Sequence, residues 1–168
     1  MSTPALIALF SYKAWATDEL FQALSKISAD QHPNALHSAI RTMNHVHVVD
    51  RIFRAHLLGE PHAYRMTNTA DTPTLSALRA STAATDNWYA QYVAAVTPQQ
   101  LSETLCFTFT DGNNGSMSRE EMLLHVITHG GYHRGTLAHI LNAVSIAPPR
   151  DLLTRYLHTA EPIRRELI

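Results

Sequence analysis

The chain has 168 residues and a formal net charge of −1, so it carries no basic field that would attract nucleic acid. No apolar run reaches the roughly 18 residues that span a membrane, and the first residues carry no secretory signal. A single cysteine, Cys106, excludes an internal disulfide and fits a reducing compartment. The sequence therefore predicts one cytoplasmic domain, residues 1–168, that binds neither nucleic acid nor a membrane. Only 16% of the residues are charged, which leaves apolar surface for self-association.

Cap residues, prolines and glycines delimit four long helical segments. The expected helices cover residues from about 3 to 27, 33 to 58, 72 to 96 and 118 to 144. The last of them begins at Ser118, which forms a predicted capping box with Glu121. A short fifth helix is expected from about Asp151 to His158.

One segment between the third and fourth helices has the two-residue period of a strand. Leu105, Phe107 and Phe109 alternate with threonines and Cys106, and the run DGNNG that follows is typical of a turn. We therefore expect an all-α four-helix bundle with a small β-hairpin or extended crossover between helices 3 and 4.

Two histidines four residues apart in the last long helix are the main candidates for chemistry. His129 and His133 stand on one face of the helix, beside an apolar stripe that runs from Met122 to Val144. The stripe predicts that His133 is buried and His129 largely buried, whereas His125 and His139 lie on its flank. Two buried imidazoles in register are either satisfied core residues or ligands of one metal ion.

The second helix offers a third histidine. His45 lies on the edge of that helix's apolar stripe and His47 lies further from its centre, so His45 is the better candidate to reach the bundle interior. Gly130 and Gly131 separate His129 from His133; either the helix ends there or the missing side chains admit a close neighbour. Gly130 also stands where a zinc protease of the HExxH type needs its glutamate, which excludes that class.

Several polar and aromatic residues have two interpretations. Asp50 and Arg134 either orient ligands or make structural contacts at the bundle edge. Cys106 is either a reactive thiol or an inert side chain on a half-buried strand. Three aromatic residues either line a substrate cavity or belong to the core; they are Tyr12, Trp15 and Tyr132.

Long stretches of the sequence resemble the DinB/YfiT-like family. The run MLLHVITHGGYHRGTL, from Met122 to Leu137, is similar to the family's signature helix, and NHVHVVDRIFRAHLLG, from Asn44 to Gly59, to its second-helix motif. The stretches YKAWATDELFQAL and FTFTDGNNGSMSREEM are also similar to that family. The resemblance implies a four-helix bundle, commonly homodimeric, with a divalent metal held by three residues. Transferred to this chain, these are His45, His129 and His133.

The function expected from these observations is that of a metal-binding protein. Some relatives are thiol-dependent isomerases or transferases, so the resemblance implies a metal-dependent enzyme that acts on a small-molecule substrate, with a low-molecular-weight thiol as cosubstrate. Metal-dependent hydrolysis and a non-catalytic metal-binding role in a stress response are the alternatives. A DNA-binding role fits poorly because lysines and arginines are scattered. Imidazole ligands suit zinc, nickel, copper and iron alike, and the sequence identifies no catalytic residue.

Overall fold

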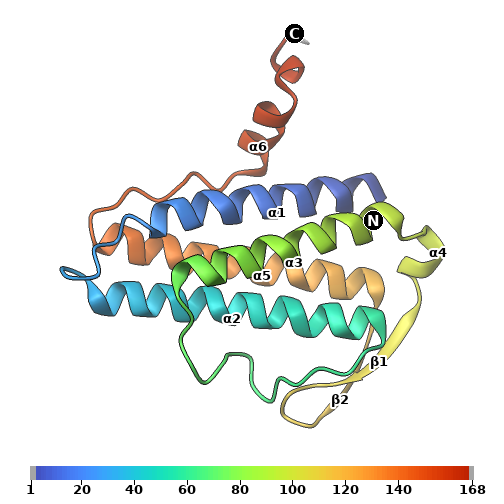
Figure 1. The fold of residues 1–168 in the computed structure, drawn as a ribbon. Helices are drawn as coiled ribbons and strands as arrows, with labels where there is room; N and C mark the ends of the chain where they lie inside the picture. The colour runs from blue at the N-terminus through green and yellow to red at the C-terminus, as the bar shows by residue number, and fades with distance from the viewer. Residues whose placement is uncertain (1–2, 167–168) are drawn as a thin grey trace.

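Four long helices form the body of the computed structural model, which describes residues 3–166 (Figure 1). They are α1 (Thr3–Leu24), α2 (Pro33–Leu58), α3 (Leu75–Ala95) and α5 (Arg119–Ala143). Helix α1 packs against α3 and α5, and α2 packs against the same two helices from the other side. The predicted four-helix bundle is therefore confirmed.

The chain crosses the length of the bundle once without forming a helix. Figure 1 shows α2 and α3 running in the same direction, so the connection between them passes back alongside α2. We call this connection, residues 59–74, the crossover. Gly59, in the left-handed conformation with φ of 68°, ends α2 and turns the chain into it.

The predicted hairpin is present between α3 and α5, after the four-residue helix α4 (Pro98–Leu101). Strands β1 (Thr104–Thr108) and β2 (Asn114–Ser118) pair antiparallel, with Thr104 opposite Ser118 and Thr108 opposite Asn114. Phe107 is buried against the bundle, but Phe109 lies beyond β1 and is exposed. Cys106 is exposed, on the opposite face of β1 from the buried Phe107.

The predicted capping box is confirmed, and two predicted helix starts are shifted. The Ser118 hydroxyl accepts from the Glu121 backbone N–H at 3.1 Å, and the Glu121 carboxylate accepts from the Ser118 N–H at 2.7 Å. Helix α3 begins after Thr74, whose hydroxyl accepts from the Ala77 N–H at 3.2 Å. Helix α6 (Leu153–Ala160) begins later than Asp151, whose carboxylate is bonded to Arg134. The 3-10 helix η1 (Pro162–Arg165) follows, and both project from the bundle (Figure 1).

Two hydrophobic clusters fill the bundle, one on each side of a polar layer. One cluster includes Phe10, Phe53 and Val126; the other includes Leu20 and Leu137. On every long helix a buried polar residue or a glycine separates the members of one cluster from those of the other; these residues include Lys13, His47, Asp86 and Gly130. Within residues 3–166, no helix is both long and apolar enough to cross a membrane.

Candidate metal centre

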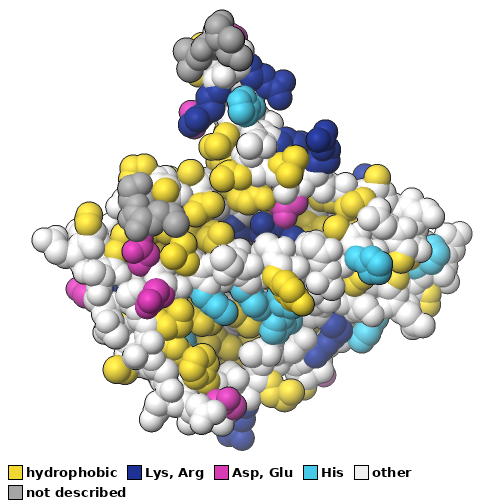
Figure 2. Space-filling model, turned by 180° about the vertical axis from the view of Figure 1, so that it is seen from behind, with side chains coloured by type: hydrophobic (Ala, Val, Ile, Leu, Met, Phe, Trp, Pro, Cys, Tyr) yellow, Lys and Arg dark blue, Asp and Glu magenta, His cyan; other side chains and the backbone are white. Residues whose placement is uncertain are grey.

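Helices α2 and α5 bring His45, His129 and His133 together where the two helices pack side by side. Each of the three offers a ring nitrogen, and these nitrogens all lie within 4.8 Å of one another. No other group of histidine, cysteine, aspartate or glutamate side chains within residues 3–166 meets this condition. Figure 2 shows histidines gathered near the middle of this face, bordered by hydrophobic side chains.

The three imidazole rings form a nearly equilateral triangle. Their centroids are 4.9 Å apart for His45 and His129, 4.7 Å for His45 and His133, and 4.5 Å for His129 and His133. The planes are inclined by 62° to 73°, so the rings meet edge to face instead of stacking. Inclined rings of this kind can turn one nitrogen each toward a common point, as a metal ion requires.

A hydrogen bond to the crossover fixes which nitrogen His45 offers. Its Nδ1 lies 2.8 Å from the Thr67 carbonyl oxygen, which can only accept, so the ring proton sits on Nδ1. Nε2 then carries the lone pair, and this atom lies 3.0 Å from Nε2 of His129, within hydrogen-bonding distance. In metal-binding histidines, the N–H of the second ring nitrogen usually donates to a carbonyl or carboxylate in this way.

The donor set fits a divalent metal. A tetrahedral zinc ion with bonds of about 2.1 Å holds its ligand nitrogens about 3.4 Å apart. The His45 and His129 nitrogens are within about 0.4 Å of that separation. A small rotation of either ring would therefore accommodate an ion.

Burial keeps the α5 histidines neutral. It lowers the pKa of His129 to about 3, helped by the neighbouring His133 and His45, and it also lowers the pKa of His133. Neutral imidazoles carry the lone pairs that metal ions need. The two α5 histidines are therefore in a metal-binding protonation state at neutral pH.

His125 borders the cluster without belonging to it. Its ring stacks on His129, with centroids 5.4 Å apart, and on Phe53 at 4.4 Å. His47, in contrast, is buried at 6% exposure on the side of α2 that faces α3. The expectation that His45 is the more interior of the two α2 histidines is wrong, because α2 packs against α3 as well as α5.

The expected burial of His133 is also wrong, since both α5 histidines are half-buried. The buried face of α5 runs through Val126, Gly130 and Arg134, which places His129 and His133 on its edge. The predicted buried face was drawn from apolar side chains alone, so it left out the glycine and the buried arginine. This position on the edge leaves the imidazoles accessible to a ligand.

Asp50 and Arg134 have structural partners elsewhere. Lys13 donates to Asp50 at 2.8 Å and to Asp86 at 2.5 Å, and all three side chains are buried. Arg134 is paired with Asp151 at 2.8 Å. The first set of contacts ties α1, α2 and α3 together, and the second ties α5 to the segment that follows it.

The aromatic residues do not form a cavity over the histidines. Tyr12 and Trp15 pack against Tyr156 of α6, with centroids 6.1 and 5.6 Å away. Tyr132 is 75% exposed and stands edge-on to His133, with centroids 5.1 Å apart. The glycines do not end α5, and a β-carbon at Gly130 would lie 3.4 Å from Arg134 and 3.6 Å from Lys13.

Thr67 contributes to the site and Lys13 to the buried ion pairs of the bundle, and neither was predicted. Thr67 acts through its backbone carbonyl, so its side chain gives no clue. Lys13 lies in a helix with a regular apolar pattern, where a single lysine at a core position was the available indication.

The comparison with curated proteins gave no match, and neither did the comparison with solved structures. A family model, in contrast, matches residues 1–166, essentially the whole chain. The family is described as the DinB family, in agreement with the resemblance of the histidine motifs. This chain therefore belongs to the DinB family.

Proposed function

We propose that His45, His129 and His133 hold one divalent metal ion, and that the protein is a metal-dependent enzyme acting on a small molecule with the help of a low-molecular-weight thiol. The observation that carries the metal site is the hydrogen bond from His45 Nδ1 to Thr67, together with the 3.0 Å approach of the two Nε2 atoms. Nδ1 of His45 meets a backbone acceptor, as in an ordinary core histidine, whereas its Nε2 meets a second imidazole nitrogen, an arrangement that a shared metal ion accounts for.

The chain's own groups provide three neutral ligands and an accessible face. When bound, the ion supplies a +2 charge that neutral imidazoles do not offset, which lowers the pKa of a coordinated thiol or water toward neutrality. Three protein ligands leave at least one coordination position for such a group. Tyr132 presents aromatic surface beside His133, and Phe53 and His125 border the other side.

Thiol chemistry is tested with cobalt in place of the native metal. Glutathione, bacillithiol and mycothiol are added in turn to cobalt-loaded protein, and the near-ultraviolet spectrum is recorded. We expect a new sulfur-to-cobalt charge-transfer band with at least one of them, because thiolate is a soft ligand. S-methylglutathione, which lacks the thiol, is the matched control and should leave the spectrum unchanged. His133→Ala should remove the response.

The outcomes separate the candidate functions. A thiol-dependent band followed by turnover of electrophilic small molecules supports the transferase or isomerase. An unchanged spectrum with all three thiols contradicts it and leaves metal-dependent hydrolysis or metal binding without turnover. Homodimerisation, a cytoplasmic location and a stress-response role remain predictions from the sequence; sedimentation of the purified chain tests the first.

A further inference from the structure

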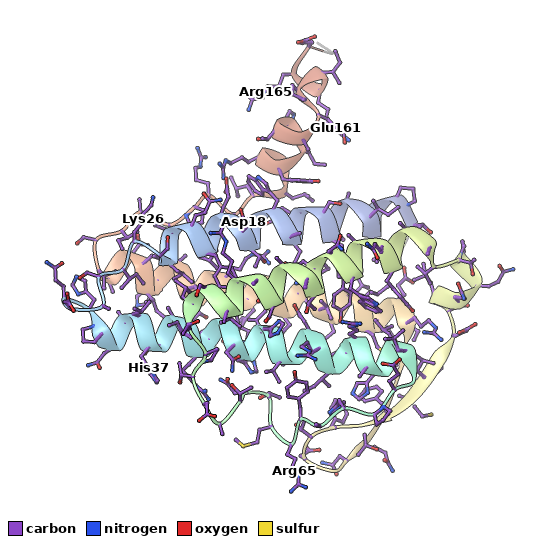
Figure 3. All side chains as sticks on the ribbon, in the orientation of Figure 1. Asp18, Lys26, His37, Arg65, Glu161 and Arg165 are labelled. Carbon is purple, nitrogen blue, oxygen red and sulfur yellow. The ribbon has the colours of Figure 1, made fainter. Side chains whose placement is uncertain are left out.

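The crossover contacts the histidine cluster through a backbone atom, the Thr67 carbonyl oxygen. Arg65 extends away from the bundle (Figure 3), and the chain then returns toward α2, where the Thr67 carbonyl accepts from His45. The carbonyl of Thr67 belongs to the rigid peptide unit that it shares with Asn68. Whatever fixes Asn68 therefore also fixes the direction of the oxygen that His45 contacts.

Asn68 is held by hydrogen bonds in two directions. Its amide nitrogen donates to the Arg41 carbonyl on α2 at 3.0 Å. Its amide oxygen accepts from Asn44 and from the Thr69 backbone N–H, the latter at 3.1 Å. These contacts use the donor and acceptor ends of the side chain, so the amide cannot turn without losing bonds.

Asn44 completes the attachment from the helix side. It is 3% exposed, directly precedes His45, and donates to both Asn68 and the Thr69 hydroxyl, the second at 2.6 Å. Arg41 adds a separate tether by donating to the Thr69 carbonyl at 2.8 Å. Loss of the Asn68 amide would thus leave the crossover attached at Thr69, while the Thr67 carbonyl would lose its fixed direction.

We propose that Asn44 and Asn68 are positioning residues of the metal centre: they lock the Thr67 carbonyl, which selects the His45 tautomer with the proton on Nδ1 and directs Nε2 at His129 and His133. This proposal rests on the proposed metal site. The physical reason is that a free imidazole exchanges between two tautomers, and a fixed acceptor at one nitrogen keeps the other available as a ligand.

The first test measures metal affinity. Zinc binding to the full chain is followed by competition with a chromophoric chelator for the wild type, Asn68→Ala and Asn68→Asp. We expect Asn68→Ala to bind zinc about 10- to 100-fold more weakly, the range found when outer partners of metal ligands are removed. Asn68→Asp keeps both acceptor bonds and should recover part of the loss. Asn113→Ala, which removes the side-chain hydrogen bond from Asn113 to Asp111 in the hairpin turn, is the control.

The second test reads the tautomer without any metal. Two-bond proton–nitrogen correlation spectra at about pH 8, where an ordinary histidine is neutral, distinguish a proton on Nδ1 from one on Nε2. We expect His45 to carry it on Nδ1 in the wild type and in Asn113→Ala, and to give a mixture in Asn68→Ala. A folded Asn68→Ala protein with the wild-type tautomer and zinc affinity would overturn the proposal.

The two tests distinguish a failure of the proposed metal site from a failure of the proposed positioning role. If the wild type binds no zinc, the proposed metal site is wrong, whereas the tautomer spectra still decide whether Asn68 positions His45. If the wild type binds zinc and Asn68→Ala binds it equally well, the metal site stands and the positioning role does not. Asn44→Ala repeats both measurements from the helix side.

Discussion

The Nε2 atoms of His45 on α2 and His129 on α5 lie 3.0 Å apart, but the two rings are held in different ways. The other nitrogen of His45 is bonded to Thr67, whereas Nδ1 of His129 is buried with no hydrogen-bond partner among the described residues. The His129 ring is instead packed between His125 and His133. One candidate ligand is thus oriented by a hydrogen bond and the other by stacking.

The buried ion-pair layer is predicted to determine stability. Lys13→Met leaves Asp50 and Asp86 as buried carboxylates without their counter-ion, so we expect the free energy of unfolding to fall by about 3–5 kcal/mol. Guanidinium denaturation measures the change. Lys26→Met alters an exposed lysine of the turn after α1 (Figure 3) and should cost much less. A loss below about 1 kcal/mol in Lys13→Met would show that the layer does not depend on its cation.

Alanine at the two glycines before His133 is predicted to stabilise the protein. A β-carbon at Gly131 would lie 3.8 Å from Arg134, and one at Gly130 would make its closest contact at 3.4 Å, both within ordinary packing distances. Removing the helix penalty of glycine should therefore raise the free energy of unfolding by up to about 1 kcal/mol for each substitution.

Gly59→Ala is the control for these substitutions. Its φ of 68° strains any residue with a β-carbon, so this change should destabilise the protein although nothing lies within 4 Å. Thermal unfolding of the three variants gives the signs. Destabilisation by Gly131→Ala would mean that a β-carbon has less room at this position than these distances indicate.

The buried His47 is predicted to make the protein less stable in mild acid. Burial, together with the nearby Arg51 charge, lowers the pKa of His47 to about 4, whereas the unfolded chain has the ordinary value of about 6.5. Below about pH 6.5, His47 binds a proton in the unfolded chain, whereas it stays neutral in the folded protein. Stability is therefore lost as the pH falls from 6.5 toward 4, by about 2 kcal/mol at pH 5 for this residue.

Denaturation in the presence of a chelator at about pH 7.5 and pH 5 tests this prediction without a contribution from bound metal. The loss between the two pH values should be smaller in His47→Gln than in the wild type. His37→Gln, at an exposed histidine of the same helix (Figure 3), should leave the loss unchanged. Equal losses in the wild type and His47→Gln would show that His47 titrates alike in both states.

The elements that could be predicted are those that depend on residues close together in the sequence. The capping box at Ser118, the bounds of α2 and the alternation around Phe107 follow from neighbouring residues in the chain. The spacing of His129 and His133 likewise indicated a shared face. The parallel course of α2 and α3 and the contact of the crossover with His45 depend on residues far apart in the sequence, and no local pattern records them.

Burial was predicted less well for the same reason. His47 is buried because a second helix packs on its side of α2, and Arg134 is buried because Asp151 neutralises it. A prediction made from the apolar pattern alone places both residues at the surface. The partner that makes a polar residue acceptable in the interior comes from another part of the chain.

Metal content of protein purified without a tag tests the central claim most directly. Inductively coupled plasma mass spectrometry, after dialysis against metal-free buffer and reloading with zinc, should find about one divalent ion per chain in the wild type. We expect His45→Ala, His129→Ala and His133→Ala to lose it, and His125→Ala and His47→Ala to retain it. A wild-type protein that holds no stoichiometric metal, or a triple His45, His129 and His133 variant that still does, would contradict the account.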